Sequence, residues 1–136
     1  MELNFSGSWL RKIHEYLEGA LHTNPLPEEI TIQQHAAHME LHCRNDEETS
    51  LYMVSFAGES SAVMTIHGMA AKARLQVKWN SFTLHTVYTV ATVEGMVQYT
   101  VQDTFHMEGE TLFVLRKNEL DTAQQWTSRA VYHKTV

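Results

Sequence analysis

Hydrophobic and polar residues alternate with a period of two along most of the chain, from residue 29 to residue 134. Successive side chains of a β-strand point to opposite faces, so this alternation predicts half-buried strands. Short polar or glycine-containing breaks separate the apolar segments, which are rich in Val, Ile, Thr, Tyr and Phe. The predicted strands lie near residues 30–34, 38–43, 50–56, 61–67, 71–79, 82–91, 96–106, 111–117 and 124–134.

The segment before residue 29 has a different pattern. In WLRKIHEYLEGALH, apolar residues such as Trp9, Ile13 and Leu17 recur at helical spacing, which predicts one helix over about residues 9–22. A serine just before it is a suitable N-cap. The prolines of TNPLPEE end the helix, because proline disfavours helix at its own position and at the preceding one.

Consecutive strands joined by short breaks favour an antiparallel meander. A meander of about eight or more strands commonly closes into a barrel, because closure removes the exposed edge strands. We therefore predict an all-β chain in which residues 1–136 form a single domain. The predicted fold is one antiparallel up-and-down barrel of roughly eight to ten strands with one N-terminal helix.

Two predicted hairpins place their apolar residues on one inner face. The segment KWNSFTL predicts a two-residue turn at Asn80-Ser81, which sets Trp79 opposite Phe82. The turn in TVEG then pairs Tyr88 with Tyr99, and the same register continues along both strands. The inward phase of the two hairpins is therefore consistent with a barrel interior.

The third hairpin brings a charged pair to the same inner face. The turn in MEGE predicts Phe105 opposite Leu112, which makes Arg116 a diagonal neighbour of Asp103. Asp103 occupies a phase that otherwise reads Val, Tyr, Val and Phe. An unpaired carboxylate there costs several kcal/mol or takes up a proton. Asp103 thus predicts either a structural ion pair or a polar cluster that contacts a ligand.

Composition restricts the classes of partner. The 136 residues carry a formal charge of −6, and 43% are hydrophobic; these values are typical of a globular chain, and they argue against nucleic-acid binding, which needs a basic stripe. No apolar run is long enough to span a bilayer. A single cysteine and no signal-peptide pattern favour a cytoplasmic protein, either monomer or homodimer. No phosphate loop or paired-cysteine metal motif indicates a cofactor.

Several short motifs follow one another in a familiar order: NFSGSW, ITIQQ, MELHC, KWNSFTL, MEGETLFV and AVYHK. In this order they resemble the small bacterial lipocalin-like proteins of the calycin superfamily. The resemblance implies an antiparallel barrel whose interior holds one small apolar ligand. This chain differs from the family where Asp103 replaces an aromatic residue, and where residues 10–28 look longer and more helical.

The inward phase also predicts which side chains line the ligand site. On the last strand, one side carries Trp126 and Tyr132 and the other carries Arg129 and His133; we favour the aromatic side inward. The predicted ligand-contacting residues are Trp79, Phe82, Thr86, Tyr88, Tyr99, Val101, Asp103, Arg116, Trp126 and Tyr132.

The stretch HAAHMELHC offers a different chemistry. At strand spacing, His38, Glu40 and His42 share one face, and these are residue types that hold metal ions. Met39 and the apolar residues at every second position after it lie on the opposite face, which points into the barrel. The three polar side chains therefore face outward. A solvated strand face is the main interpretation, and a surface metal or haem site is the alternative.

Three functions follow as hypotheses. The first is binding of a small, largely apolar molecule inside the barrel. The second is a cofactor-free isomerase or cyclase in the same interior, with acid–base assistance from Asp103 and from Tyr88 and Tyr99. The third is metal or haem binding through the histidines.

Overall fold

The computed structural model describes residues 3–17, 24–46, 48–65, 70–120 and 125–135. Within them lie the strands of one sheet, whose order is β5-β7-β8-β9-β10-β11-β1-β2-β3-β4-β6. The strands are β1 (Gly7–Tyr16), β2 (Glu29–Gln34), β3 (His38–Asn45), β4 (Glu48–Ser55), β5 (Ser61–Ala62), β6 (Met64–Thr65), β7 (Ala70–Val77), β8 (Ser81–Thr92), β9 (Gly95–Glu108), β10 (Thr111–Leu120) and β11 (Gln125–Lys134).

All neighbouring strands run antiparallel, which confirms the up-and-down barrel. The barrel is nearly closed by β5 and β6, which follow each other in residues 61–65. On one side β5 pairs with β7, and on the other side β6 pairs with β4. Between them, the Val63 N–H donates to the carbonyl of Ala71 at 2.9 Å. Counted as one interrupted strand, this segment makes a barrel of ten strands.

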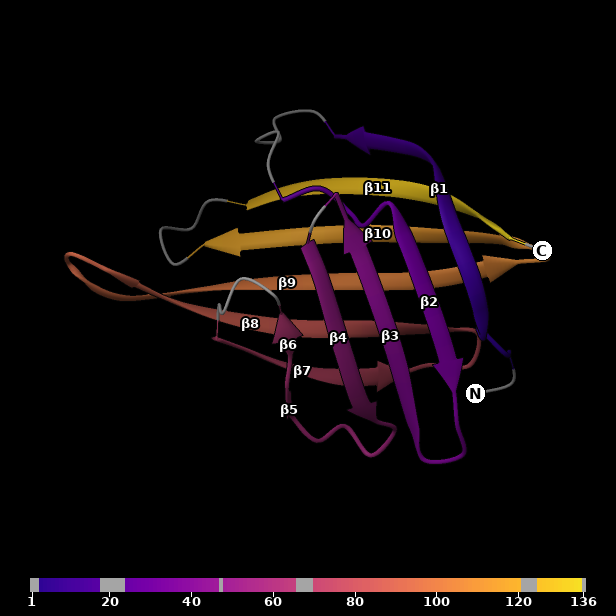
Figure 1. Cartoon of the computed structure of the whole chain (residues 1–136), viewed down its shortest axis with the longest axis horizontal. Helices are drawn as coiled ribbons and strands as arrows, with labels where there is room; N and C mark the ends of the chain where they lie inside the picture. Colours follow the sequence, from indigo (N-terminus) through magenta and orange to yellow (C-terminus); the bar gives the residue numbers. More distant parts are fainter. Residues whose placement is uncertain (1–2, 18–23, 47, 66–69, 121–124, 136) are drawn as a thin grey trace.

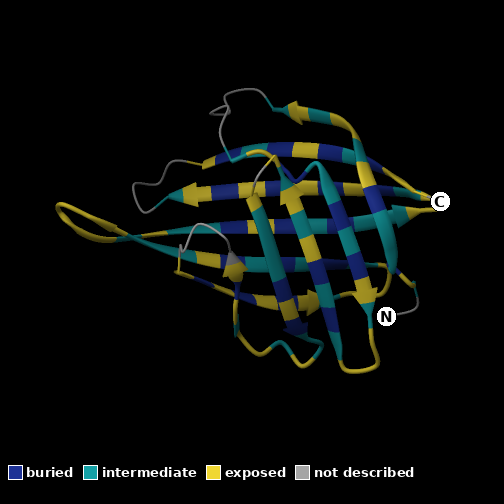
Figure 2. Ribbon diagram, in the orientation of Figure 1, coloured by how far each residue is buried: buried dark blue, intermediate teal, exposed yellow. Residues whose placement is uncertain are grey.

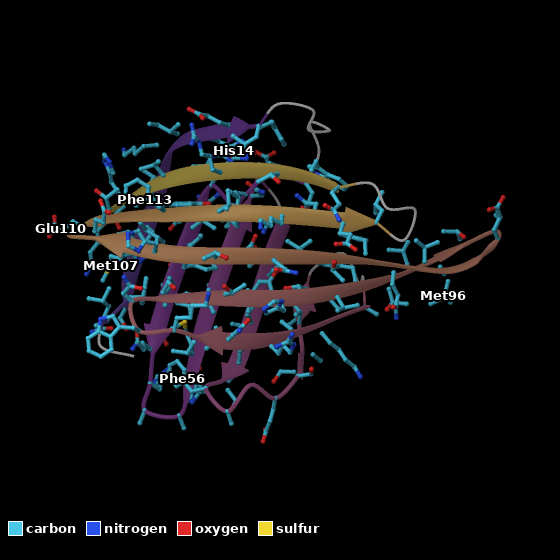
Figure 3. All side chains as sticks on the ribbon, turned by 180° about the vertical axis from the view of Figure 1, so that it is seen from behind. His14, Phe56, Met96, Met107, Glu110 and Phe113 are labelled. Carbon is cyan, nitrogen blue, oxygen red and sulfur yellow. The ribbon has the colours of Figure 1, made fainter. Side chains whose placement is uncertain are left out.

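The barrel is flattened into two layers that cross steeply (Figure 1). Strands β2, β3 and β4 form one layer, and β8, β9, β10 and β11 pass behind them, while the curved β1 joins the two. The hairpin of β8 and β9 extends beyond the rest of the barrel, and Met96 lies on this extension (Figure 3). The structure therefore has a compact interior and one protruding hairpin.

Burial alternates along strands such as β7 and β10, as the sequence pattern predicts (Figure 2). The centre of the interior is aromatic: Phe82 stacks on Phe105 with ring centroids 4.5 Å apart, and Phe5 meets Phe82 edge-on at 4.9 Å. Trp9 is fully buried beside them in the same core. These rings fill the interior of the barrel at the end where the chain begins β1.

The predicted helix over residues 9–22 is wrong for the part that the structure describes. Residues 9–16 belong to strand β1, and residues 18–23 lie outside the described part of the chain. A register shift between Arg11 and Ile13 marks a β-bulge in the pairing of β1 with β11. The bulge breaks the alternation of two, so Trp9 is buried whereas Ile13, four residues later, is 50% exposed. No described helix is long and apolar enough to cross a membrane.

Two predicted hairpin registers are wrong by two residues, although their inner faces are right. Val77, not Trp79, lies opposite Phe82, because the turn between β7 and β8 is longer than two residues. In the same way, Phe105 lies opposite Val114. A shift of two keeps every side chain on its face, so the hydrophobic pattern alone does not detect it.

Candidate functional site

A buried ion pair joins β9 to β10 inside the barrel. The corrected register places Arg116 directly opposite Asp103 rather than diagonal to it. Arg116 Nε donates to Asp103 Oδ1 at 2.7 Å and Nη2 donates to Oδ2 at 2.8 Å, while both side chains are less than one-tenth exposed. Burial opposes the guanidinium charge, but the adjacent carboxylate outweighs it and raises the pKa of Arg116. Geometry of this bidentate kind is strong and directional.

Further polar side chains extend the pair across the inner face. Ser128 of β11 lies opposite Arg116, and Asn118 follows two residues later on β10. Both are fully buried. The Ser128 hydroxyl has no hydrogen-bond partner among the described residues. A buried polar atom without a partner is uncommon and marks this end of the interior as incompletely satisfied.

Residues 24–27, which we call the strap, cross this polar end between β1 and β2. Arg116 Nη1 donates to the carbonyl of Pro25 at 3.1 Å and lies 3.4 Å from both oxygens of Asn24. The Asn24 amide in turn donates to Asn118 Oδ1 at 2.7 Å. The same guanidinium therefore holds both the buried carboxylate and the strap.

Other side chains also fasten the strap to the barrel, among them Asn45, whose amide donates to the carbonyl of Pro25 at 3.2 Å. The Tyr132 hydroxyl donates to the carbonyl of Pro27, and Arg11 Nη1 donates to the carbonyl of Leu26 at 2.7 Å. The Leu26 N–H donates to His14 Nε2 at 3.3 Å. The Leu26 side chain is fully buried, so the strap is anchored by packing as well as by polar contacts.

Three tyrosines line the interior beside the strap. The hydroxyls of Tyr52 and Tyr88 lie 3.3 Å apart, and the Tyr88 ring stacks on Tyr99 with centroids 4.7 Å apart. Burial raises the pKa of Tyr52 and of Tyr88, and it raises that of Tyr99 to about 12. All three phenols are therefore neutral hydrogen-bonding groups at ordinary pH.

A small pocket opens at this end of the barrel. Its volume is about 80 Å³. Its walls include Tyr52, Tyr88, Cys43 and Arg116, and the strap prolines Pro25 and Pro27 cover it. Burial raises the pKa of the Cys43 thiol to about 12, so Cys43 is a neutral wall residue and not a nucleophile. The pocket is mainly polar: the guanidinium groups of Arg44 and Arg116, the Glu48 carboxylate and the two phenols all contribute to its walls.

The structure brings several of the sequence-predicted residues together and moves one away. Arg116 holds Asp103 and lines the pocket together with Tyr88, on which Tyr99 stacks. The predicted residues that are buried in the interior are Phe82, Thr86, Val101, Trp126 and Tyr132. This confirms the aromatic side of the last strand as the inner one. The predicted inward placement of Trp79 is wrong: the residue lies outside the strands at the turn before β8 and is 71% exposed.

Sequence reasoning missed Tyr52 and the strap. Tyr52 lies in the inward phase of β4 opposite Leu41, so alternation could have found it. The strap has no periodic pattern, and its contacts join positions up to 105 residues apart. The two prolines in TNPLPEE were the available signal, because a proline lacks a backbone N–H and so favours an irregular segment over a helix or a central strand.

The geometry does not favour Asp103 as an acid or base. Both of its oxygens accept from Arg116, and the pocket walls do not include it. A general base needs an oxygen within reach of the substrate proton. The role of Asp103 that the contacts describe is to position the guanidinium.

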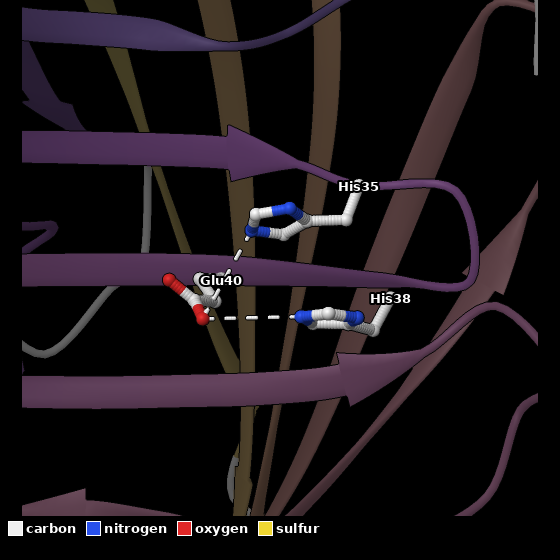
Figure 4. A group of neighbouring side chains, drawn as sticks. All are labelled: His35, His38 and Glu40. Atoms are coloured by element: carbon white, nitrogen blue, oxygen red, sulfur yellow. Dashed lines mark ion pairs between the residues drawn. The ribbon is translucent and has the colours of Figure 1, made fainter.

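The histidine stretch lies on the outer face of the barrel. The outward placement of His38 and Glu40 agrees with the sequence pattern, and His42 is exposed further along β3. His35, rather than His42, gathers with His38 and Glu40 at the turn between β2 and β3 (Figure 4). The interior pocket and this outer group are separate sites.

No family model matches this sequence, and no curated protein matches it either. The nearly closed antiparallel barrel is therefore the part of the lipocalin-like resemblance that the structure shows.

Proposed function

We propose that this chain is a lipocalin-like binding protein that holds a small, largely apolar molecule by its polar end under the strap. The observation that carries the proposal is the pocket where Arg116, Tyr52 and Tyr88 converge at the mouth of the barrel. In ligand sites a few convergent polar groups fix the orientation of the ligand, and this pocket offers such groups for the polar end of a molecule.

The polar groups at the mouth retain hydrogen-bonding capacity for a ligand. The Arg116 guanidinium has five N–H donors. Asp103 and the strap occupy the donor on Nε, those on Nη1 and one of the two on Nη2. The Tyr52 and Tyr88 hydroxyls bond to each other and to no other described group. Each hydroxyl donates once and accepts up to twice, so the pair has acceptor capacity left over.

The size of the pocket defines what enters it. A volume of about 80 Å³ admits a polar headgroup of a few atoms while the strap is closed. The remainder of the ligand lies along the stacked rings of Tyr88 and Tyr99, which continue from the pocket toward the protruding hairpin. Larger molecules require the strap to move away from Arg116.

Native mass spectrometry of the untagged chain, followed by thermal shift with medium-chain fatty acids and their alcohols, tests the proposal. We expect a retained or added ligand with a one-to-one stoichiometry and a rise in Tm. Tyr88→Phe weakens the binding by about fivefold, which corresponds to one neutral hydrogen bond. Trp79→Ala, at the exposed turn, is the matched control and leaves the affinity unchanged. A barrel that retains nothing and responds to none of these molecules contradicts the proposal.

A further inference from the structure

Three metal-ligating side chains gather at the turn between β2 and β3, away from the interior pocket. The His35 N–H donates to the carbonyl of His38 at 2.9 Å and closes a turn with Ala36 and Ala37 at its tip. Residues that flank such a turn lie opposite each other on the same face of the sheet. Glu40 follows His38 by two residues on β3, so it shares that face.

The three side chains point their ligand atoms at one small volume. His35 Nε2 and His38 Nε2 lie 4.0 Å and 3.8 Å from the same oxygen, Glu40 Oε1 (Figure 4). All three ligand atoms lie within 4.8 Å of one another. These separations exceed hydrogen-bonding distance, so the atoms surround a point without bonding to each other. Among the described residues, none of the three side chains has another hydrogen-bond partner.

We propose that His35, His38 and Glu40 form a binding site for a divalent transition-metal cation of the zinc type. Two imidazole nitrogens and one carboxylate oxygen are a ligand set that Zn²⁺ uses where it keeps an open coordination position. The imidazoles argue against Mg²⁺ and Ca²⁺, which prefer oxygen ligands.

The geometry requires a modest rearrangement when the cation binds. Around a tetrahedral Zn²⁺ with bonds of about 2.0–2.1 Å, ligand atoms lie about 3.3 Å apart. The observed distances to Glu40 therefore shorten by less than 1 Å. The His35 and His38 rings are stacked 4.4 Å apart with planes at 17°, so each ring must tilt to aim its lone pair at the cation. Both side chains are more than 40% exposed, which leaves room for this tilt.

The site has access to an external ligand. His35 also lines an open hollow of about 450 Å³ with Gln34, Ala36, Phe56 and Val77. A cation held by three protein atoms keeps its fourth position for water or for a molecule in this hollow. The site lies on the outer face, so it does not depend on the interior pocket of the proposed function.

The test uses the untagged full-length chain and Zn²⁺, measured by isothermal titration calorimetry with a competing chelator. We expect one Zn²⁺ per chain. His35→Ala, His38→Ala and Glu40→Gln each weaken binding by at least about tenfold, since even outer-shell partners contribute this much. The matched control is His42→Ala, which removes a histidine from the same face of β3 and leaves the affinity within about twofold.

A second readout reports coordination directly. Co²⁺ in place of Zn²⁺ gives visible absorption bands that are intense in tetrahedral sites, and we expect these bands in the unmodified chain and their loss in His35→Ala. Absence of Zn²⁺ binding by the unmodified chain overturns the proposal. A loss of binding in His42→Ala as large as in His35→Ala also overturns it, because the ligands would then be a different set.

Discussion

Arg116 faces Asp103 directly across two strands and contacts both of its carboxylate oxygens inside the barrel. The same guanidinium reaches out to the backbone of Pro25 in the strap. The pair thus connects the barrel wall to the segment that covers its mouth, and the stability of the two is coupled.

Removing one partner of this pair leaves a buried charge without compensation. Asp103→Asn and Arg116→Met should each lower the free energy of unfolding by about 3–5 kcal/mol in urea titrations. The double variant Asp103→Val with Arg116→Leu should lose clearly less than the sum, because it buries no charge. Glu15→Gln, which breaks the exposed pair with Arg129, is the control and should cost less than about 1 kcal/mol. Additive losses in the double variant would contradict a coupled pair.

The Tyr132 hydroxyl of β11 donates to the carbonyl of Pro27 in the strap. Tyr132→Phe leaves that carbonyl without its donor and should lower the free energy of unfolding by about 1–3 kcal/mol. The ring remains in place, so the aromatic core should be unchanged. Hydrogen exchange of the amides of residues 26 and 28 should accelerate as the strap loosens. Unchanged exchange at these amides would show that Tyr132 does not hold the strap.

His14 makes the strap sensitive to pH. Burial lowers the pKa of His14, and the positive charges of Arg11 and Arg116 lower it further. As the pH falls, the unfolded chain therefore protonates at His14 before the folded chain does. The contribution of neutral His14 to the free energy of unfolding is fully present above a pH of about 6.5 and is lost as the pH falls below it. Protonation also removes the acceptor of the Leu26 N–H. His14 lies on β1 (Figure 3).

Thermal unfolding between about pH 7 and pH 5 measures this effect. The fall in Tm over that range should be smaller in His14→Gln, which keeps an acceptor and cannot be charged. His42→Gln, at an exposed position on β3, should show the same fall as the unmodified chain. If the His14 variant follows the unmodified chain as well, another group controls the acid sensitivity.

The reactivity of the Cys43 thiol measures whether the strap closes the mouth of the barrel. Its pKa of about 12 in the folded chain leaves very little thiolate near neutral pH. Alkylation by iodoacetamide at about pH 8 should be at least about a hundredfold slower than in the unfolded chain. Tyr132→Phe should accelerate the reaction in the folded state. Equal rates in folded and unfolded chains would mean that the thiol lies in water.

Trp79 and Phe82 differ sharply in burial although they are three positions apart. Phe82 is fully buried between two other rings, and Phe82→Ala should cost about 3–5 kcal/mol. Trp79 is 71% exposed, and Trp79→Ala should change the free energy of unfolding by less than about 0.5 kcal/mol. Urea titration distinguishes the two. A large loss in the free energy of unfolding for Trp79→Ala would instead support the inward placement of Trp79 that the predicted two-residue turn implied.

Alternation along the strands predicted the barrel, its inner face and the inward position of Asp103, because burial on one face imposes a period of two. It did not predict registers that differ by two residues, since such a shift leaves every face unchanged. That is why Arg116 was expected on the diagonal and is found directly opposite. The helix prediction failed at the bulge near Arg11, where one extra residue changes the phase.

The sequence pattern did not predict the strap or the metal-ligating group, and the reason is a different one. Contacts such as that of Asn24 with Asn118 join distant positions, and only the closed barrel brings them together. His35 was assigned to the turn itself, while the chain needs only Ala36 and Ala37 at its tip. One residue of turn length thus decided whether His35 lies on the same face as Glu40.

The short strands β5 and β6, which join β4 to β7, determine where the barrel opens locally. Among the residues that the structure describes, two residue pairs join β6 to β4 and two join β5 to β7, whereas β8 and β9 share a continuous ladder of twelve. Local opening starts where the fewest hydrogen bonds must break together. The barrel is therefore weakest where residues 61–65 join β4 to β7. Its first local opening separates the strands at this join and leaves the β8–β10 ladder intact.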